Sequence, residues 1–487
     1  MRVRWDLTTS TEGLTGGDLM SVQRMFRGTL VLFVVAALAV TSPTASAAKR
    51  PTPGGTMLPI VFVHGQTGSA QQFETQAMRF TSNGYPQHLL YAFEYDTNQT
   101  ANPVGDLDAF VDDVLAETGA PQVYAIGHSR GTSVWTSYLD GEGGVDGSEK
   151  VAKYVNIDGR SPAELPGGVP TIGSWGEWNT AGSGFNRRGD TNAQIGPDPA
   201  NNFYFGSKSH TEVATSAEAF AVMYEFLTGS APRTTEVVPE PPGQVTIAGR
   251  AVLFPENVGA VDTTVEVWRV DPQTGHRVGS RPRATFPIDE TGAWGPVRVN
   301  GLWHLELAIV RPGVGVHHTY TEPFMRSDHF VRLNTSLPDG PLDLITPDSD
   351  QTTNLVILRM KEWWGDQGAN SDRLLVDGLD IVRPDTSPRT GVNLAVFVHD
   401  DGLDGVTDLG KGELFPFNLL TFLTAVDVSI PASADGSGSI SVTEDPRDGG
   451  DTAVLNVPNW PSSTDPVSVQ FRDYSQDDER FPGSRGR

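Results

Sequence analysis

The fold is decided by residues 123–139, which read VYAIGHSRGTSVWTSYL. An apolar run leads into the turn Gly127-His128-Ser129-Arg130-Gly131, and a helix-compatible stretch follows. This order predicts a strand, a sharp turn and a helix, with the serine exposed at the apex. The two glycines avoid a side-chain collision across so tight a turn. The helix points free N–H groups at the serine, which favours negative charge developing there.

The composition is that of a large acidic chain without cysteine. The chain has 487 residues, which is enough for two or three domains, and a formal net charge of −25. The absence of cysteine excludes disulfides, a thiol nucleophile and a cysteine-based metal site. The negative charge is spread over both halves of the chain, which argues against binding to nucleic acid or to an anionic membrane by charge alone.

The N-terminal region has the pattern of a secretory signal. A basic flank at 24–27 precedes an apolar run at 30–40 and an A-x-A sequence at 45–47. This pattern predicts a signal peptide over 1–47, cleavage after Ala47 and an extracellular protein. The run is too short for a comfortable membrane span, although an uncleaved anchor is the alternative. Residues 1–19 lie upstream of two natural start codons and need not be translated.

Three regions with different patterns follow the signal. Residues 48–228 alternate strand and helix signals, which predicts a parallel sheet with helices on both faces. A proline-rich linker is expected at 229–244. Beyond it, short strands separated by Gly, Pro and Asp turns predict an all-β region. We expect two sandwich-like units there, at 245–337 and 338–480.

A serine hydroxyl needs a base to take its proton and an acid to orient that base. In a strand–turn–helix fold of this kind, the acid and then the histidine follow the serine in the chain. Of the four histidines in this domain, His64 and His88 lie upstream of Ser129, and His128 adjoins it with its side chain turned away. His210 is therefore the predicted base. A helix cap is the alternative role for His210.

Asp158 is the preferred acid. It directly follows the strand predicted at 151–157, so it lies at the same sheet edge as Ser129. Asp190 and Asp198 compete with it but lie in loops rich in Gly, Asn and Pro. A solvated turn carboxylate is the alternative role for Asp158.

Acyl transfer also needs donors for an oxyanion. The backbone N–H of Arg130 is one candidate, because it follows the serine directly. The other candidate is the backbone N–H of Gln66 in the sequence HGQTG at 64–68. The side chains of Gln66 and Arg130 need not take part. An ordinary glycine turn is the alternative interpretation of HGQTG.

Four segments now suggest a family. They are VHGQTG at 63–68, GHSRG at 127–131, NIDG at 156–159 and SKSHTEV at 207–213. Together they resemble an α/β-hydrolase, and within that superfamily a secreted bacterial or archaeal lipase. The resemblance covers residues 58–228. It extends to thermostable archaeal lipases whose β-rich C-terminal half is implicated in lipid binding.

The resemblance implies a minimal α/β-hydrolase sheet, hydrolysis of lipid or small esters by a Ser-His-Asp triad, and no cofactor. The larger lipases carry a helical lid. Here residues 160–202 are rich in Gly and Pro, so any lid is expected to be a loop. An extracellular acyltransferase or polyester hydrolase would use the same triad. A surface-binding protein with a relic hydrolase domain is the non-enzymatic alternative.

Two apolar features of the C-terminal half have alternative interpretations. The segment LFPFNLLTFL at 414–423 predicts sandwich core if buried and contact with lipid if exposed. Trp363 and Trp364 cannot both face one core from a strand, so one is exposed or the pair lies in a loop.

Two polar features of the same half were examined as metal sites. The sequence DDGLDG at 400–405 hints at calcium but lacks the ligand pattern of an EF-hand loop, so a solvated turn is favoured. His317 and His318 have no visible third ligand. No metal site is assigned.

Overall fold

The structure is a computed structural model that describes residues 57–178, 193–337, 340, 344–447 and 449–472. The predicted signal peptide and the competing acid Asp190 lie outside these residues. Within the described part of the chain, no helix is long and apolar enough to cross a membrane.

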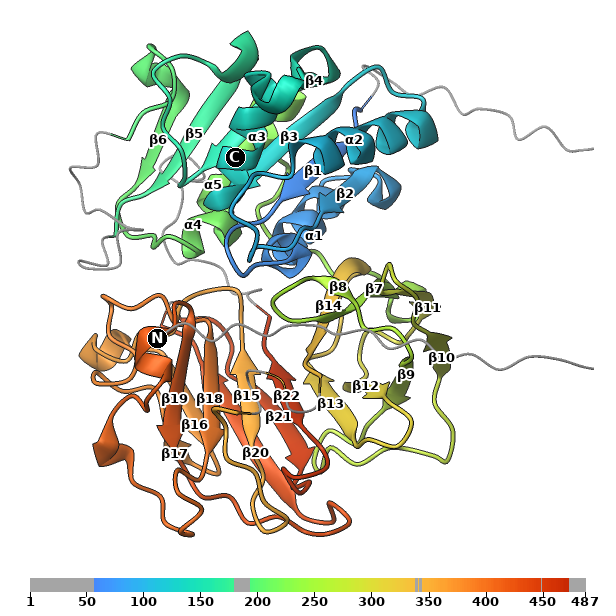
Figure 1. Cartoon of the computed structure of the whole chain (residues 1–487), viewed down its shortest axis with the longest axis vertical. Coiled ribbons are helices and arrows are strands. Elements are labelled where there is room, and N and C mark those ends of the chain that lie inside the picture. Colours follow the sequence, from blue (N-terminus) through green and yellow to red (C-terminus); the bar gives the residue numbers. More distant parts are fainter. Residues whose placement is uncertain (1–56, 179–192, 338–339, 341–343, 448, 473–487) are drawn as a thin grey trace, which may run out of the picture. The chain divides into compact units, whose positions relative to one another are not determined.

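The first described domain is built on one parallel sheet of six strands in the order β2-β1-β3-β4-β5-β6 (Figure 1). The strands are β1 (Ile60–Val63), β2 (Leu90–Phe93), β3 (Val123–His128), β4 (Val151–Ile157), β5 (Thr171–Gly176) and β6 (Asn202–Phe205). The helices are α1 (Glu74–Ser82), α2 (Val104–Thr118), α3 (Arg130–Leu139), α4 (Glu212–Thr215) and α5 (Ala217–Thr228). The predicted α/β class is confirmed.

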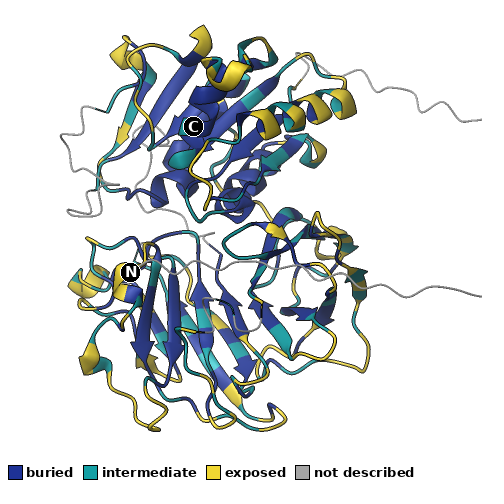
Figure 2. Ribbon diagram, viewed as in Figure 1, coloured by how far each residue is buried: buried dark blue, intermediate teal, exposed yellow. Residues whose placement is uncertain are grey.

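Helices cover both faces of this sheet, which explains why both faces of a central strand such as β1 are apolar. In β1, Ile60 and Phe62 pack into one core with residues of α1 and α5, such as Phe220. Val61 and Val63 pack into the opposite core with residues of α2 and α3. Figure 2 shows the strands buried and α2 exposed along its outer side.

Strand β5 lies within residues 160–202, where the sequence pattern predicted no strand. All six of its residues are buried. Its two glycines weaken the sequence signal for a strand, but packing requires both. A Cβ at Gly173 would lie 2.6 Å from Trp175 Nε1, and a Cβ at Gly176 would lie 2.6 Å from the carbonyl oxygen of Ser209.

The C-terminal half is all-β, as predicted. Its long sheet has the order β10-β9-β12-β13-β22-β15-β18-β19, and two smaller sheets have the orders β11-β7-β14, with β8 on β7, and β17-β16-β20-β21. The strands are β7 (Thr246–Leu253), β8 (Val258–Gly259), β9 (Thr264–Arg269), β10 (Ala284–Pro287), β11 (Ala293–Arg298), β12 (Leu305–Val310), β13 (Val316–Thr321), β14 (Asp328–Thr335), β15 (Leu355–Leu358), β16 (Arg373–Val376), β17 (Leu379–Asp380), β18 (Ala395–His399), β19 (Leu423–Asp427), β20 (Ser439–Asp445), β21 (Ala453–Pro458) and β22 (Val467–Gln470).

The two expected sandwich-like units share the long sheet. One core lies between the β7 sheet and strands β9 and β12, and a second lies between the β20 sheet and strands β15, β18 and β22. The two parts join where β13 pairs with β22 in parallel, with His318 opposite Val467. Because β22 comes late in the chain and pairs beside β13, local sequence patterns gave no sign of this junction.

A buried carboxylate links the α/β domain to the β7 sheet. Glu94 follows β2 and accepts hydrogen bonds from Arg250 Nη1 at 2.8 Å and Arg332 Nε at 2.6 Å. Burial alone would raise the pKa of Glu94, but the two guanidinium groups outweigh it and lower the pKa to about 2. The Glu94 carboxylate therefore stays ionised at neutral pH, and its negative charge offsets the positive charges of the two guanidinium groups.

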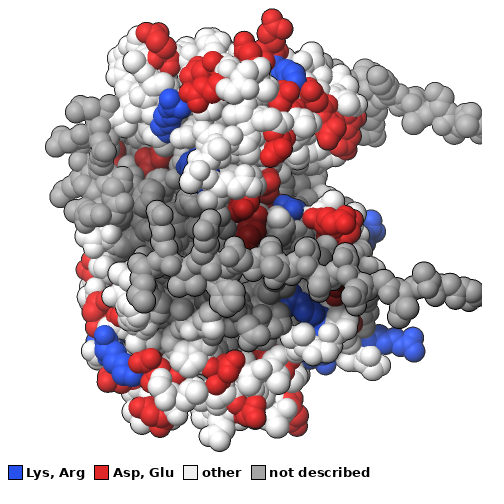
Figure 3. Space-filling view, in the orientation of Figure 1, with Lys and Arg blue, Asp and Glu red and all other residues white. Residues whose placement is uncertain are grey.

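The visible surface reflects the acidic composition of the chain. Figure 3 shows acidic side chains over more of the visible face than basic ones. The sequence has 60 acidic residues and 35 lysines and arginines, which accounts for this difference.

Candidate active site

Ser129 occupies the predicted sharp turn between β3 and α3. Its backbone has φ 53° and ψ −121°, a strained conformation for a residue with a side chain. The glycines around it are required by close packing. A Cβ at Gly127 would lie 2.8 Å from Trp135 Cδ1, and a Cβ at Gly131 would lie 2.1 Å from the carbonyl oxygen of Val63.

The structure brings the side chains of Ser129, His210 and Asp158 together. His210 Nε2 lies 2.9 Å from Ser129 Oγ, and His210 Nδ1 lies 2.7 Å from Asp158 Oδ2. Asp158 follows β4, and His210 lies between β6 and α4. The hydroxyl can donate to Nε2 while the Nδ1–H donates to the carboxylate. This tautomer leaves the imidazole ready to accept the serine proton.

Asp158 is held by the backbone as well as by the histidine. Its Oδ1 accepts a hydrogen bond from the N–H of Gly176 in β5 at 3.1 Å. Burial raises the pKa of Asp158, and the hydrogen bond from His210 opposes that rise. The competing acid Asp198 instead accepts a hydrogen bond from the N–H of Ala200 and caps a short turn.

The two predicted oxyanion donors lie on segments that meet at Ser129. A Cβ at Gly65 would lie 2.9 Å from Ser129 Cβ, so the loop carrying Gln66 is in close contact with the serine. Among the described residues, the backbone N–H groups of Gln66 and Arg130 donate no hydrogen bond. The two side chains bond to each other instead, because Arg130 Nη1 donates to Gln66 Oε1 at 2.7 Å. This bond ties the two segments together, and no sequence pattern indicated it.

The other histidines of the domain have different surroundings. His64 is buried and stacked on Tyr95 at 4.6 Å, and burial lowers its pKa to about 4. His88 is exposed. His128 donates from Nε2 to the carbonyl oxygen of His210 at 2.8 Å, and its Nδ1 accepts from Gln72 Nε2 at 2.5 Å. The pair Gln72 and His128 therefore supports the backbone of His210, a role that the sequence did not reveal.

Two models of lipase domains match the chain. The model for lipase (class 2) matches residues 57–160, and the model for the lipase C-terminal domain matches residues 243–338. The fold is that of an α/β-hydrolase, and lipase models match two parts of the chain. The class 2 match includes Ser129, Asp158 and Gln66. A further model of a C-terminal domain matches residues 342–475.

Solved structures similar to this chain include bacterial proteins. The product of gene lin2722 from Listeria innocua is 14% identical, with a TM-score of 0.28, over 37% of this chain and 97% of its own. The mature lipase BlEst2 from Bacillus licheniformis is also 14% identical, with a TM-score of 0.28, over 37% of this chain and 94% of its own.

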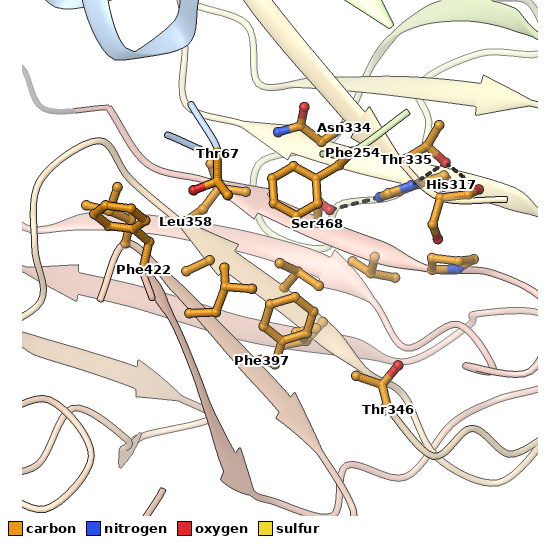
Figure 4. Close-up of a pocket in the computed structure, with 18 of the residues that line it drawn as sticks. Thr67, Phe254, His317, Asn334, Thr335, Thr346, Leu358, Phe397, Phe422 and Ser468 are labelled. Atoms are coloured by element: carbon orange, nitrogen blue, oxygen red, sulfur yellow. Dashed lines mark hydrogen bonds between the residues drawn. The ribbon is translucent and has the colours of Figure 1, made fainter. Parts of the chain in front are cut away.

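A cavity of about 500 Å³ includes Ser129 and Gln66 in its lining. Much of the remaining wall comes from the C-terminal half, including the apolar side chains of Leu358, Phe397 and Phe422 (Figure 4). The sequence did not predict this cavity, because its walls come from segments hundreds of residues apart.

The cavity also has a polar part. His317 Nε2 lies 2.8 Å from Ser468 Oγ, and His317 Nδ1 lies 3.2 Å from Thr335 Oγ1 (Figure 4). Burial lowers the pKa of His317 to about 4, so the ring is neutral. The adjacent His318 points to the other face of the sheet and contacts Glu306 at 2.6 Å.

No group of side chains among the described residues could hold a metal ion. The Asp400 carboxylate accepts hydrogen bonds from the N–H groups of Asp404 at 3.1 Å and Gly405 at 2.9 Å, which stabilises the turn that hinted at calcium. Trp363 and Trp364 lie in the loop after β15, which was one of the two expected arrangements, and both are buried.

Proposed function

We propose that this chain is a secreted serine lipase that hydrolyses long-chain acylglycerols through Ser129, His210 and Asp158. The observation that carries the proposal is the pair of contacts from the His210 ring, 2.9 Å to the serine oxygen and 2.7 Å to the carboxylate. Secretion rests on the predicted signal peptide, and an exported protein that begins at Ala48 would support it.

The proposed reaction proceeds through an acyl-enzyme. Ser129 Oγ attacks the ester carbonyl while His210 Nε2 takes its proton. His210 then gives that proton to the leaving alcohol. It later takes a proton from the attacking water and returns it to Ser129 Oγ as the acyl–serine bond breaks and the acid leaves. Asp158 holds the imidazole in the required tautomer. The backbone N–H groups of Gln66 and Arg130 stabilise the oxyanion.

The cavity supports a substrate with a long acyl chain. Its volume of about 500 Å³ is in the range of small-molecule sites, and apolar side chains such as Leu358 and Phe397 line it beyond Ser129. A short acyl group would leave this apolar wall unused. A longer chain gains roughly 0.8 kcal/mol for each methylene that it buries.

The function is tested by hydrolysis of p-nitrophenyl esters from acetate to palmitate. We expect kcat/KM to rise by up to about 4-fold per methylene until the chain fills the cavity. A flat profile would contradict the assignment of the cavity to the acyl chain. Product analysis with glycerol or another alcohol present would identify an acyltransferase, because the acyl group would then pass to the alcohol.

We also propose that the segment 414–423 contacts the lipid surface. The segment is divided between core and surface. Leu414 and Phe417 are buried, whereas Phe415 is 77% exposed and Leu419 is 72% exposed. The last two residues of the segment, Phe422 and Leu423, line the cavity. Exposed apolar side chains next to the cavity would let lipid reach it directly.

Replacing both Phe415 and Leu419 by serine is expected to lower activity on emulsified trioctanoylglycerol by about 10²-fold or more. Each side chain would otherwise bury apolar surface worth about 1.5–3 kcal/mol in the lipid. Activity on soluble p-nitrophenyl acetate should not change. The matched control is Leu302→Ser, because Leu302 is 73% exposed in a different part of the chain. Equal losses in both variants would contradict the proposal.

A further inference from the structure

The residues on either side of the active-site histidine are contacted by a residue of the C-terminal half. Glu362 lies in the loop after β15 and is fully buried. Its carboxylate accepts hydrogen bonds from the N–H of Thr211 at 2.9 Å, the N–H of Glu212 at 3.2 Å and the hydroxyl of Ser209. These three donors flank His210 on both sides in the sequence.

The segment 209–212 has little regular structure of its own to hold it. It lies between the end of β6 and α4, and α4 has only four residues. A helix that short forms few internal hydrogen bonds, so it does not fix the residue before it. The segment therefore depends on its contacts with other parts of the chain. His128 donates a hydrogen bond to the carbonyl oxygen of His210. Glu362 accepts hydrogen bonds from the N–H groups of the two residues that follow His210.

Glu362 is itself held in place. Its carbonyl oxygen accepts hydrogen bonds from Arg359 Nη2 at 2.7 Å and from Arg447 Nη1. Arg447 Nη2 also lies 3.0 Å from Glu212 Oε2. Both arginines pair with Asp372, at 2.8 Å from Arg359 and 2.6 Å from Arg447. The carboxylate thus acts on the His210 segment from a fixed backbone in the C-terminal half.

We infer that Glu362 is a positioning residue of the active site, which holds residues 209–212 so that His210 reaches Ser129 and Asp158 together. This inference rests on the proposed function. It gives the C-terminal half a part in the chemical step, separate from any contact with lipid. The consequence is that loss of Glu362 slows hydrolysis of even the smallest soluble esters, which need no acyl cavity.

The test compares full-length Glu362→Ala and Glu362→Gln with the native chain on p-nitrophenyl acetate. We expect Glu362→Ala to lower kcat by about 10²-fold with KM changed by less than about 3-fold, because an imidazole displaced by about 1 Å loses that much rate. Glu362→Gln keeps one acceptor oxygen, so its kcat should lie between that of the native chain and that of Glu362→Ala. A role confined to stability would leave kcat of the folded protein unchanged.

The matched control is Glu444→Gln. Glu444 is buried and lies 2.6 Å from Arg359, so this change disturbs the same arginine without touching residues 209–212. Glu444→Gln should leave kcat within about 3-fold of the native value, since this change does not move His210. Equal losses for Glu444→Gln and Glu362→Gln would overturn the inference.

Labelling by a fluorophosphonate separates this inference from the proposed function. The native chain should react at Ser129, and Glu362→Ala should react about 10²-fold more slowly. If both react equally fast, the inference is wrong and the proposed function stands. If the native chain does not react at all, both are overturned. Thermal unfolding of each variant shows whether it is folded. If Glu362→Ala is not folded, the labelling rate and kcat of Glu362→Gln decide the result.

Discussion

Replacing Ser129 by alanine is expected to lower kcat on p-nitrophenyl butyrate by about 10⁶-fold, to the residual rate given by binding and oxyanion stabilisation alone. The hydroxyl that alanine removes lies 2.9 Å from His210 Nε2, so the variant loses the proposed nucleophile. The fold should survive, because alanine is smaller and adopts the same φ of 53° at a cost no greater than that of serine.

The measurement combines initial rates with labelling by a fluorophosphonate, which should be lost in the same variant. Ser133→Ala is the matched control, since Ser133 lies one turn further along α3 and outside the cavity lining. We expect it to retain activity within about 2-fold, as for other surface changes away from the chemistry. Full activity of Ser129→Ala would refute the proposed function.

The α/β fold was predictable because its signals are local. The apolar run at 60–63, the turn around Ser129 and the helical periodicity at 107–115 each reflect a neighbourhood within the chain. Strand β5 was missed because packing against the His210 segment requires glycines in it, and glycine weakens a strand signal. The shared long sheet was missed because the pairing of β13 with β22 joins residues about 150 positions apart.

The candidate site was only partly predictable for the same reason. Chain order and position after a strand selected Asp158 and His210, which the structure places in contact. Nothing local distinguishes Gln72 or Glu362 from other polar residues. Each acts on the His210 segment through the fold, Gln72 by way of His128 and Glu362 from the C-terminal half.

Replacing Asp158 by asparagine is expected to lower kcat by about 10³–10⁴-fold. The amide has nearly the same shape, and its oxygen can still accept from the N–H of Gly176. Its NH₂ group, however, would face Nδ1 of His210 and favour the tautomer that carries its proton on Nε2. That tautomer cannot accept the proton of Ser129, so the loss should appear in kcat and not in KM.

The same substitution, Asp158→Asn, should not lower the stability of the folded protein. Burial raises the pKa of Asp158 above its ordinary value, even after the opposing hydrogen bond from His210. The folded protein therefore binds this proton more tightly than the unfolded chain, and its stability falls as pH rises through the raised pKa. A neutral asparagine avoids this cost at neutral pH. The unfolding temperature of Asp158→Asn should thus be no lower than native.

The same shift predicts how the native enzyme responds to acid. Lowering the pH through the raised pKa of Asp158 neutralises the carboxylate, so kcat should fall at a higher pH than it would for an exposed aspartate. Asp198→Asn is the control, because Asp198 only caps a turn at Ala200 and should leave both the rate and the pH profile unchanged. If Asp158→Asn kept the native rate, the carboxylate would have no part in orienting His210. The acid would then have to be sought elsewhere.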